Sequence, residues 1–452
     1  LVVLQATADM YMTPDGPQPF VRRRETLRVK GGDDEVMEVI ETRWGPLLDS
    51  DHRGRPQALR WVAHDPPAVN LNLLRLETAA NVDEALDIAS RAGMPGQNFL
   101  AAGRDGRIGW TIAGPIPRRF GHDGRTPESW ADGRRGWEGY LPPPDYPRIT
   151  DPPLGRLWTA NNRVVSGEAL EILGDGGYAL GARARQIRDD LLALDAATEA
   201  DLLAVQLDDR ALFLHRWRAL LLAVLTPRAL ENAPRRRQMR ALVEHWDGRA
   251  AADSAGYRLV RTFRNALAAE VFSALTAPCR AADPWFDYGW INQSEGPLWQ
   301  LASRQPPHLL NSRYPDWQAQ FLAAVDTTLD DIAGDGDVAA HPWGERNTLR
   351  MVHPFSLFIP ALGRFLDMPA QPLPGDVNMP RVQTPTHGAS QRLVVAPGRE
   401  AQGILHMPGG QSGHPLSPHY RDGHDAWVRG EATPFLPGPA VNVLRLVPDA
   451  GN

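Results

Sequence analysis

The sequence has little cysteine, little lysine and no long apolar run, and each shortage excludes a class of protein. Cys279 is the only cysteine among 452 residues, so a disulfide framework and a thiolate metal site are excluded. A catalytic cysteine is the alternative that remains, but we expect this thiol to be buried and structural. Lys30 is the only lysine. The net charge is −6 and no basic stripe with interleaved aromatic residues occurs, which argues against a nucleic-acid partner. The longest apolar run, Ala219 to Leu225, is far shorter than the ~20 residues that span a bilayer, so we expect no membrane partner.

The remaining composition is that of a globular protein with one large or several smaller domains. Apolar residues make up 42% of the chain and charged residues 23%. Patterns typical of strands come first, helical patterns follow, and strand patterns return near the end. We therefore predict an α+β fold in three parts: residues 1–184 with hairpins and a long active-site loop, a helical insert at 185–335, and a return to the core sheet at 336–452.

Local patterns predict individual elements in the first part. Alternating apolar and polar residues on either side of glycine-rich turns indicate two hairpins, which join 25–30 to 36–43 and 99–102 to 107–112. Helical spacing behind Asn81 predicts a short helix at about 81–91, with Asn81 as its cap. Residues 115–157 are rich in proline, glycine, arginine and tryptophan, and so long a loop is usually functional or tightly packed.

Apolar residues at three- and four-residue spacing predict helices in the second part. Their expected ranges are 186–194, 199–225, 236–245, 254–275 and 317–332. In the third part, strands are expected at 391–396 and 402–406, on the two sides of a Pro-Gly turn.

Two generic motifs near the C-terminal end are candidates for a catalytic serine and for a metal site. Ser412 lies in Gly410-Gln-Ser-Gly-His414, but the second glycine is one place out of register for a nucleophile elbow, so a structural turn is favoured. His414, His419 and His424 recur every five residues, which matches neither one face of a helix nor one face of a strand. No carboxylate pair completes a metal set with them.

The segment from Leu157 to Arg163, Leu-Trp-Thr-Ala-Asn-Asn-Arg, contains side chains that can take part in catalysis. An apolar pair leads into two adjacent amides, as expected where a strand ends and presents polar side chains at its tip. An asparagine N–H can donate to the oxyanion of an acyl-transfer transition state. The alternative is that Asn161 and Asn162 only turn the chain, because asparagine tolerates left-handed backbone geometry. Taken alone, these residues favour the alternative.

Several other segments of the sequence must be considered together with Leu157–Arg163. They are, in chain order, Arg43-Trp-Gly-Pro46, Asn98 to Trp110, Gly136 to Pro142, Ala182 to Arg188, His245-Trp-Asp-Gly248, Leu373-Pro-Gly-Asp376 and Pro408 to Tyr420. Each is weak alone, but together and in this order they resemble the large subunit of the penicillin acylase family of N-terminal-nucleophile hydrolases. Ala182 departs from that family, which usually has an aromatic residue there.

The resemblance implies a fold and an activity. The fold is the four-layer αββα sandwich of N-terminal-nucleophile hydrolases, with a helical insert. The activity is hydrolysis of linear amides, such as a β-lactam side chain or an N-acyl homoserine lactone, through a serine acyl-enzyme. The family makes a precursor that cuts itself, and the new N-terminal serine uses its own α-amino group as the base.

The resemblance also assigns residues. Asn161 matches the asparagine whose side chain helps to build the oxyanion hole, and Arg183 matches the arginine that holds this asparagine in place. The two are 22 positions apart, a spacing similar to that of the family. Arg185 is a less favoured occupant of the arginine role.

Other parts of the family's site are expected outside this sequence. Leu1 starts inside an apolar run, like the strand some way downstream of the nucleophile, so we expect a fragment whose serine and cleavage junction lie upstream. Calcium is the expected cofactor, with Pro117 offering a backbone carbonyl and Asp175 a carboxylate, and most ligands elsewhere. A small (alpha) subunit from the same precursor is the expected partner, and the bacterial periplasm or the exterior the expected location.

Two alternatives remain from the sequence. One is a catalytically inactive binding or scaffold protein that keeps the fold, since this stretch holds no matching serine. The other is an unrelated hydrolase that uses Ser412 or the histidine cluster.

Overall fold

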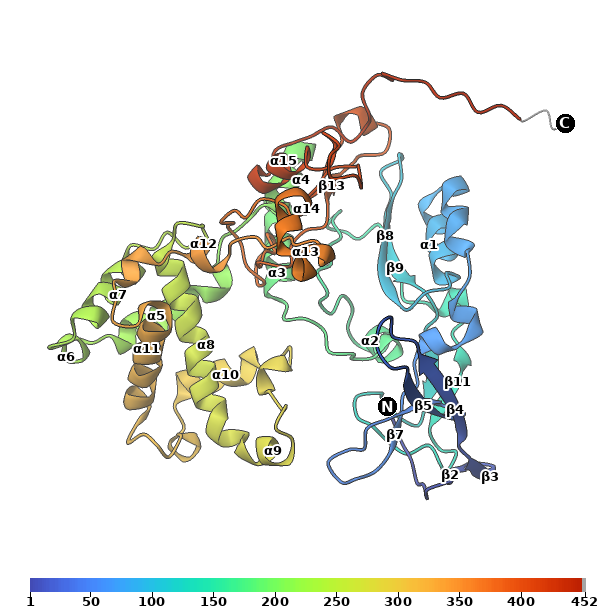
Figure 1. Cartoon of the computed structure of the whole chain (residues 1–452), viewed down its shortest axis with the longest axis horizontal. Helices are drawn as coiled ribbons and strands as arrows, with labels where there is room; N and C mark the ends of the chain where they lie inside the picture. Colours follow the sequence, from blue (N-terminus) through green and yellow to red (C-terminus); the bar gives the residue numbers. More distant parts are fainter. Residues whose placement is uncertain (449–452) are drawn as a thin grey trace. The chain divides into compact units, whose positions relative to one another are not determined.

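The computed structural model describes residues 1–448 and confirms the α+β class, with small antiparallel sheets and many helices (Figure 1). The chain forms two compact units. The first combines Leu1–Ala184 with Asn265–Phe321, and the second combines Arg185–Arg264 with the chain from Leu322 onward. These units are defined by contacts, whereas the division into 1–184, 185–335 and 336–452 follows sequence character, and that division stays a prediction.

A five-stranded antiparallel sheet with the order β1-β7-β6-β5-β4 organises the first unit. Its strands are β1 (Val2–Val3), β4 (Val21–Leu27), β5 (Glu35–Thr42), β6 (Gly45–Leu48) and β7 (Gln57–Ala58). The predicted hairpin at 25–43 is confirmed, because β4 pairs with β5 from Val21↔Glu41 to Leu27↔Glu35. A small hairpin, β2 (Met10–Thr13) with β3 (Gly16–Pro19), precedes it.

A three-stranded sheet, β12-β9-β8, forms next to helix α1 (Figure 1). Strands β8 (Gln97–Ala102) and β9 (Ile108–Ala113) are the second predicted hairpin, and β12 (Ile149–Thr150) pairs with the other edge of β9. Helix α1 (Val82–Ser90) begins where predicted, since the Asn81 side chain accepts a hydrogen bond from the Glu84 N–H at 2.9 Å. Leu86 and Ala89 of this helix are fully buried.

Residues 115–157, which are rich in arginine and tryptophan, do not form an open loop. It forms β10 (Pro117–Phe120) and β11 (Gly136–Tyr140), an antiparallel pair with an irregular register between Pro117 and Arg119. Trp130, from the connection between them, is 6% exposed and packs with Trp44 in a core cluster that also contains Tyr11. Tight packing therefore accounts for part of this long segment.

Helices dominate the rest of the described chain. They are α2 (Glu168–Leu173), α3 (Ala182–Leu192), α4 (Glu199–Gln206), α5 (His215–Val224), α6 (Pro227–Leu230), α7 (Pro234–Glu244), α8 (Ala255–Leu275), α9 (Ala277–Ala282), α10 (Glu295–Arg304), α11 (Trp317–Ala333), α12 (Trp343–Arg346), α13 (Pro354–Phe358), α14 (Gly363–Leu366) and α15 (His424–Arg429). None of the helices in residues 1–448 is long and apolar enough to cross a membrane.

Three expectations for these regions need comment. The single helix at 199–225 is wrong: it breaks between α4 and α5, where the Asp208 carboxylate accepts the Arg210 N–H at 3.0 Å and competes with helical bonding. The hairpin near 391–406 is confirmed as β13 (Arg392–Val394) and β14 (Ile404–His406). Cys279 is exposed on α9 and not buried as expected, because this short helix does not bury that face.

A buried polar network explains the Leu373-Pro-Gly-Asp376 segment. The Asp376 carboxylate accepts hydrogen bonds from the Tyr257 hydroxyl at 2.6 Å and from the Arg261 guanidinium. The Trp343 indole N–H donates to the Gly375 carbonyl at 3.0 Å. Asp376 is 4% exposed, so its charge depends on these donors, and the segment has a structural role in the second unit.

A coupled pair of carboxylates gives this unit a pH dependence. Arg210 is ion-paired with both Asp190 and Asp208. Burial, and then the neighbouring Asp208, raise the pKa of Asp190 from 3.8 to about 6. The native protein therefore keeps a proton on Asp190 that the unfolded chain releases between about pH 4 and pH 6. The free energy of unfolding should consequently fall as the pH rises through this window. The pKa of Asp208 is lowered to about 2, so the titration of Asp208 changes stability only below this pH window.

We predict that Asp190→Asn removes this decline. One pKa unit corresponds to about 1.4 kcal/mol, and solvent screening of this partly exposed group reduces the expected change to about 1 kcal/mol. Urea unfolding between pH 4 and pH 7, followed by tryptophan fluorescence, measures it. Asp253→Asn, at an exposed carboxylate in the same unit, is the control. An unchanged slope in Asp190→Asn would exclude Asp190 as its source.

Candidate active site

The turn at Asn161 has the geometry that the structural alternative requires. Asn161 has a φ of +59°, in the left-handed region, and its carbonyl accepts the Ala179 N–H at 2.9 Å. The neighbouring Asn162 is consumed by the turn: its side chain accepts the Ala160 N–H at 2.9 Å and donates to the Arg163 carbonyl at 2.7 Å. Asn162 therefore has a structural role, whereas the Asn161 side chain has a different partner.

That partner is Arg183, in the first turn of α3. Its Nη2 donates to Oδ1 of Asn161 at 2.7 Å and to the Ala160 carbonyl at 2.9 Å. A guanidinium group can only donate, so it fixes which end of the amide faces it. With Oδ1 held by Arg183, the Nδ2 group must lie on the other side of the Asn161 amide, where it is available as a donor. The structure thus brings the two predicted residues together.

Arg183 and Arg185 lie in different surroundings. Arg183 is half-buried, and this burial lowers the pKa of its guanidinium. The Arg185 side chain is 77% exposed and lies 3.8 Å from the Asp189 carboxylate. Arg183, and not Arg185, is therefore the arginine in contact with the Asn161 turn.

Asn161 lines a cavity of about 400 Å³ within the first unit, a size that suits a small organic molecule. Its wall includes Trp110 and Ile112 of β9 and Tyr178 of the loop before α3. The Trp110 indole N–H donates to Oδ1 of Asn98 at 2.9 Å, so the two ends of the Asn98–Trp110 segment meet at this wall. No serine, threonine, cysteine or lysine is among the described residues that line the cavity.

Tyr178 is a lining residue that sequence reasoning missed. Its hydroxyl donates to the Gly174 carbonyl at 3.1 Å, and burial raises the pKa of the phenol. The only signal in the sequence is the glycine-rich stretch that precedes it, which indicates a turn but not where the tyrosine lies.

The two predicted calcium ligands lie in different surroundings. Pro117 lines the cavity, whereas Asp175 is exposed and its carboxylate accepts the Gly177 N–H at 3.4 Å. In residues 1–448 there is no group of three or more histidine, cysteine, aspartate or glutamate side chains suited to a metal ion. Calcium stays a prediction, with most of its ligands expected outside this sequence.

Ser412 and the histidine series lie in the second unit and have structural partners. The Ser412 hydroxyl oxygen accepts the His414 N–H at 3.1 Å. His419 contacts the Asp422 carboxylate at 2.8 Å, and Nδ1 of His424 contacts the Pro408 carbonyl at 2.8 Å. These contacts do not join the serine to a histidine base, so they support the structural reading.

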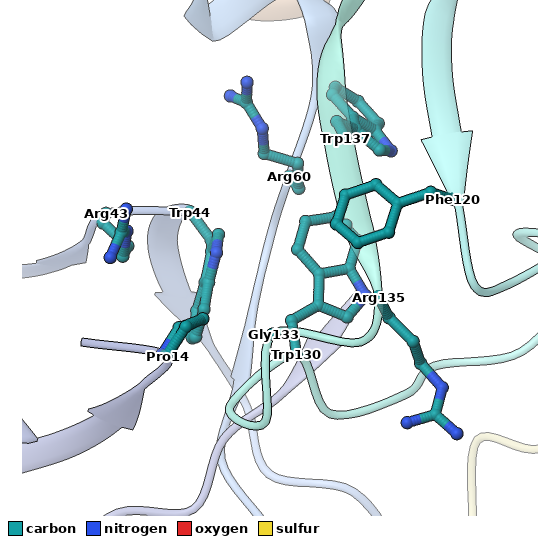
Figure 2. Close-up of a pocket in the computed structure, with 10 residues that line it drawn as sticks. Pro14, Arg43, Trp44, Arg60, Phe120, Trp130, Gly133, Arg135 and Trp137 are labelled. Carbon is teal, nitrogen blue, oxygen red and sulfur yellow. The ribbon is translucent and has the colours of Figure 1, made fainter. Parts of the chain in front are cut away.

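A second cavity of about 340 Å³ lies beside β10 and β11, and Figure 2 shows its aromatic and arginine side chains. Arg60 lies over the Trp137 ring, with its Cζ 4.7 Å from the ring centre, and pairs with Asp65 at 2.6 Å. Arg135 pairs with Glu128, also at 2.6 Å. Arg43, the third arginine of the lining, pairs with Asp15 at 2.6 Å. Carboxylates therefore neutralise all three lining arginines, and no charge is left to define a ligand.

Comparison with known proteins identifies the fold and the family of the chain. It shares the fold of the thermostable penicillin G acylase from Alcaligenes faecalis, with a TM-score of 0.62 over 98% of this chain and 85% of that one, at 18% sequence identity. A model of the penicillin amidase family matches residues 1–440, so the chain belongs to the penicillin amidase family.

Two curated relatives show how much of such proteins the chain represents. It is 27% identical to penicillin acylase 2 proenzyme of Pseudomonas sp. (strain SE83), over 93% of this chain and 54% of that protein. It is also 27% identical to the acyl-homoserine lactone acylase QuiP of Pseudomonas aeruginosa, over 95% of this chain and 56% of that protein. The chain thus spans about half the length of these relatives.

We predict that Arg183→Ala lowers the free energy of unfolding by about 1.5–3 kcal/mol, because it removes hydrogen bonds from a half-buried cation to two acceptors. Arg185→Ala, the matched control two positions away, should change it by less than about 0.5 kcal/mol. Denaturant unfolding of both variants provides the comparison. Equal effects would mean that the bonds to Ala160 and Asn161 contribute nothing measurable.

Proposed function

We propose that this chain forms the larger part of an amide hydrolase that releases an acyl group from nitrogen. The observation that carries the proposal is the hydrogen bond from Arg183 to Oδ1 of Asn161 at 2.7 Å, beside a cavity of small-molecule size. Membership of a family whose named members include penicillin acylase and acyl-homoserine lactone acylase supports it.

In the proposed mechanism, the nucleophile is a serine at the start of the mature large subunit, upstream of Leu1. Its α-amino group takes the hydroxyl proton, and the oxygen attacks the amide carbon. Negative charge then develops on the former carbonyl oxygen, where the Nδ2 group of Asn161 donates a hydrogen bond. The α-ammonium group then gives its proton to the leaving nitrogen, so the intermediate collapses with release of the amine and leaves an acyl-enzyme. Water hydrolyses this acyl-enzyme by the same steps, with the α-amino group taking the proton of the water.

The role of Arg183 in this mechanism is positional. If the Asn161 amide rotated by half a turn, Oδ1 would face the oxyanion and repel it. Arg183 opposes this rotation because its guanidinium accepts no hydrogen bond and would lose its acceptor. Such preorganised donors act without reorganisation during the reaction, which is the basis of their catalytic effect.

The substrate class follows from the family and the cavity. We propose a small acyl amide, such as a β-lactam with an acyl side chain or an N-acyl homoserine lactone, with part of the molecule in the cavity beside Trp110 and Tyr178. We further propose a self-cleaving precursor, a small subunit as partner and a periplasmic or secreted location. Cell fractionation and mass spectrometry of the mature protein test the last three.

A catalytically inactive scaffold is the second candidate, because no serine, threonine, cysteine or lysine is among the described residues that line the cavity. The sequence of the complete gene separates the two. The enzyme needs an in-frame serine at the cleavage junction upstream of Leu1, and another residue at that position would favour the scaffold.

The substrate prediction concerns the complete protein, expressed from its full gene. We expect hydrolysis of at least one amide from a panel of phenylacetyl, glutaryl and long-chain acyl derivatives. Release of the free amine measures the activity. If a correctly cleaved protein released no amine from any of the three classes, the proposed substrate class would be wrong.

The prediction for Asn161 uses two variants that retain the turn. Asn161→Gly keeps the left-handed backbone but removes the amide, and Asn161→Asp keeps an acceptor for Arg183 but has no N–H to donate. Because both lose the oxyanion donor, we expect turnover in the complete protein to fall roughly a hundredfold or more in each. Asn161→Gly also removes one of the two acceptors of Arg183, so its free energy of unfolding should fall by less than that of Arg183→Ala, whereas Asn161→Asp keeps that acceptor. Near-normal turnover in Asn161→Gly would support the alternative that Asn161 only turns the chain.

A further inference from the structure

The hairpin of β13 and β14 places two basic side chains, Arg392 and His406, against each other inside the second unit. The two residues are directly opposite in the antiparallel pair, where side chains on the same face are close neighbours. They are 2% and 4% exposed. Nη1 of Arg392 lies 3.1 Å from Nε2 of His406. The hairpin therefore depends on a contact between two groups that can both carry positive charge.

The partners of His406 fix its protonation state. A guanidinium group only donates, so Nε2 of His406 must accept from Arg392 and carries no proton. Nδ1 lies 2.8 Å from the Glu431 carbonyl, which only accepts, so the single proton of the ring is on Nδ1. The arrangement requires a neutral imidazole with this one tautomer.

A second proton on His406 would break the contact with Arg392. The proton would have to bind Nε2, where it would set an imidazolium N–H against a guanidinium N–H, and neither group can accept. Two positive charges would then meet in buried surroundings, where repulsion is stronger than in water. Burial lowers the pKa of His406, and the nearby Arg392 and Arg381 lower it further, whereas the Glu431 carbonyl opposes this shift.

Arg392 keeps its charge over the pH range in which a histidine titrates. Burial, and then the nearby Arg381, lower the pKa of Arg392 to about 10, which is still far above that range. The guanidinium donates to the Trp427 carbonyl at 2.8 Å and lies over the Trp427 ring, with Cζ 5.1 Å from the ring centre. The positive charge that faces His406 is therefore permanent in neutral and mildly acidic solution.

Carboxylates on the elements around the hairpin have other partners in the described structure. Five of them are on α4, in the turn of the hairpin, and on or just after α15, and a sixth, Asp209, acts on Arg381. Their partners are Arg399 for Glu199, the Thr198 hydroxyl for Asp201, the Gly398 N–H for Glu400, Arg429 for both Asp425 and Glu431, and Arg249 for Asp209. None of these contacts places a carboxylate at Nε2 of His406 to stabilise an imidazolium.

The same contact fastens the hairpin to α15 and to the chain that follows this helix. The Trp427 carbonyl that accepts from Arg392 is on α15, and the Glu431 carbonyl beside His406 comes just after it. Further along, the Leu405 N–H donates to the Thr433 carbonyl at 3.0 Å. Loss of the Arg392–His406 contact would therefore weaken the attachment of the whole hairpin.

We propose that the Arg392–His406 contact is an acid-sensitive latch: a proton from solvent on Nε2 of His406 releases the β13–β14 hairpin from α15 and the chain after it. In the open form water surrounds His406, which then binds a proton below its ordinary pKa of 6.5, whereas the closed form resists that proton. Acid therefore favours the open form. The proton on Asp190 acts in the opposite direction on global unfolding, so the latch must be measured locally. It operates whether or not the protein hydrolyses amides.

Hydrogen exchange followed by mass spectrometry tests the latch in the protein expressed from its complete gene. Exchange is measured between pH 5.5 and pH 7.5 and corrected for the intrinsic effect of pH on amide exchange. We expect the protection of residues 392–406 and 431–435 to fall severalfold as the pH falls, with a limit of about tenfold per pH unit for one proton. Helix α7, in the same unit, should show no such fall.

Three variants identify the group that responds. His406→Gln offers an acceptor to Arg392 but does not titrate, so the protection of the hairpin should not depend on pH. Arg392→Gln should lower protection at neutral pH but weaken its dependence on acid, because an amide can accept from an imidazolium. His419→Gln is the matched control, since this exposed histidine lies 2.8 Å from the Asp422 carboxylate, and it should behave like the unaltered protein.

Two results would overturn the proposal. One is a protection of residues 392–406 in the unaltered protein that stays constant from pH 7.5 to pH 5.5, a result that needs no variant to fold. The other is an equal loss of protection in His406→Gln, which would assign the effect to a different group. Neither measurement uses amide hydrolysis, so each is separate from the test of the proposed activity.

Discussion

The bond between the Arg183 guanidinium and the Asn161 amide is the contact on which the candidate site depends. It joins a turn in the left-handed region to the start of α3, and it decides which atom of the amide remains available as a donor. Neither residue is chemically reactive alone. Together they fix the direction of the Asn161 amide donor. A donor that need not reorient stabilises developing charge better than water does.

Arginine performs the same task at several other junctions. Arg119 donates to carbonyls at the end of α2, and Arg218 donates to the Val243 and Glu244 carbonyls at the end of α7. A planar fork of donors suits the several carbonyl oxygens that a helix end presents, whereas an ammonium group supplies a single point of charge. A chain with one lysine can therefore use its arginines as structural connectors as well as surface charges.

Local rules predicted the elements whose cause is local. The Asn81 cap and the 99–112 hairpin depend on residues a few positions apart, and both are present. The break before α5 was missed because one side chain, Asp208, competes for the backbone there. The exposure of Cys279 was missed because burial depends on what packs against α9, which no short window contains.

The candidate site, like the fold, could be predicted from the sequence only in part. Colinear motifs pointed to Asn161 and Arg183, but the direction of the amide required coordinates. Tyr178 had no motif, since its place in the cavity wall comes from a contact with Gly174 that the loop makes only after folding.

Strand β4 has a consequence for how the protein behaves among its copies. It is the edge of the five-stranded sheet, all seven of its residues are exposed, and Arg22, Arg23 and Arg24 lie in a row along it. An open edge of this kind is a template for pairing with another molecule, and charged side chains along the edge oppose that pairing because it would partly desolvate them. Arg22 and Arg23 are also held by Glu38 and Glu41 of β5. Pairing with a second molecule would have to remove these guanidinium groups from water, which favours the dispersed protein.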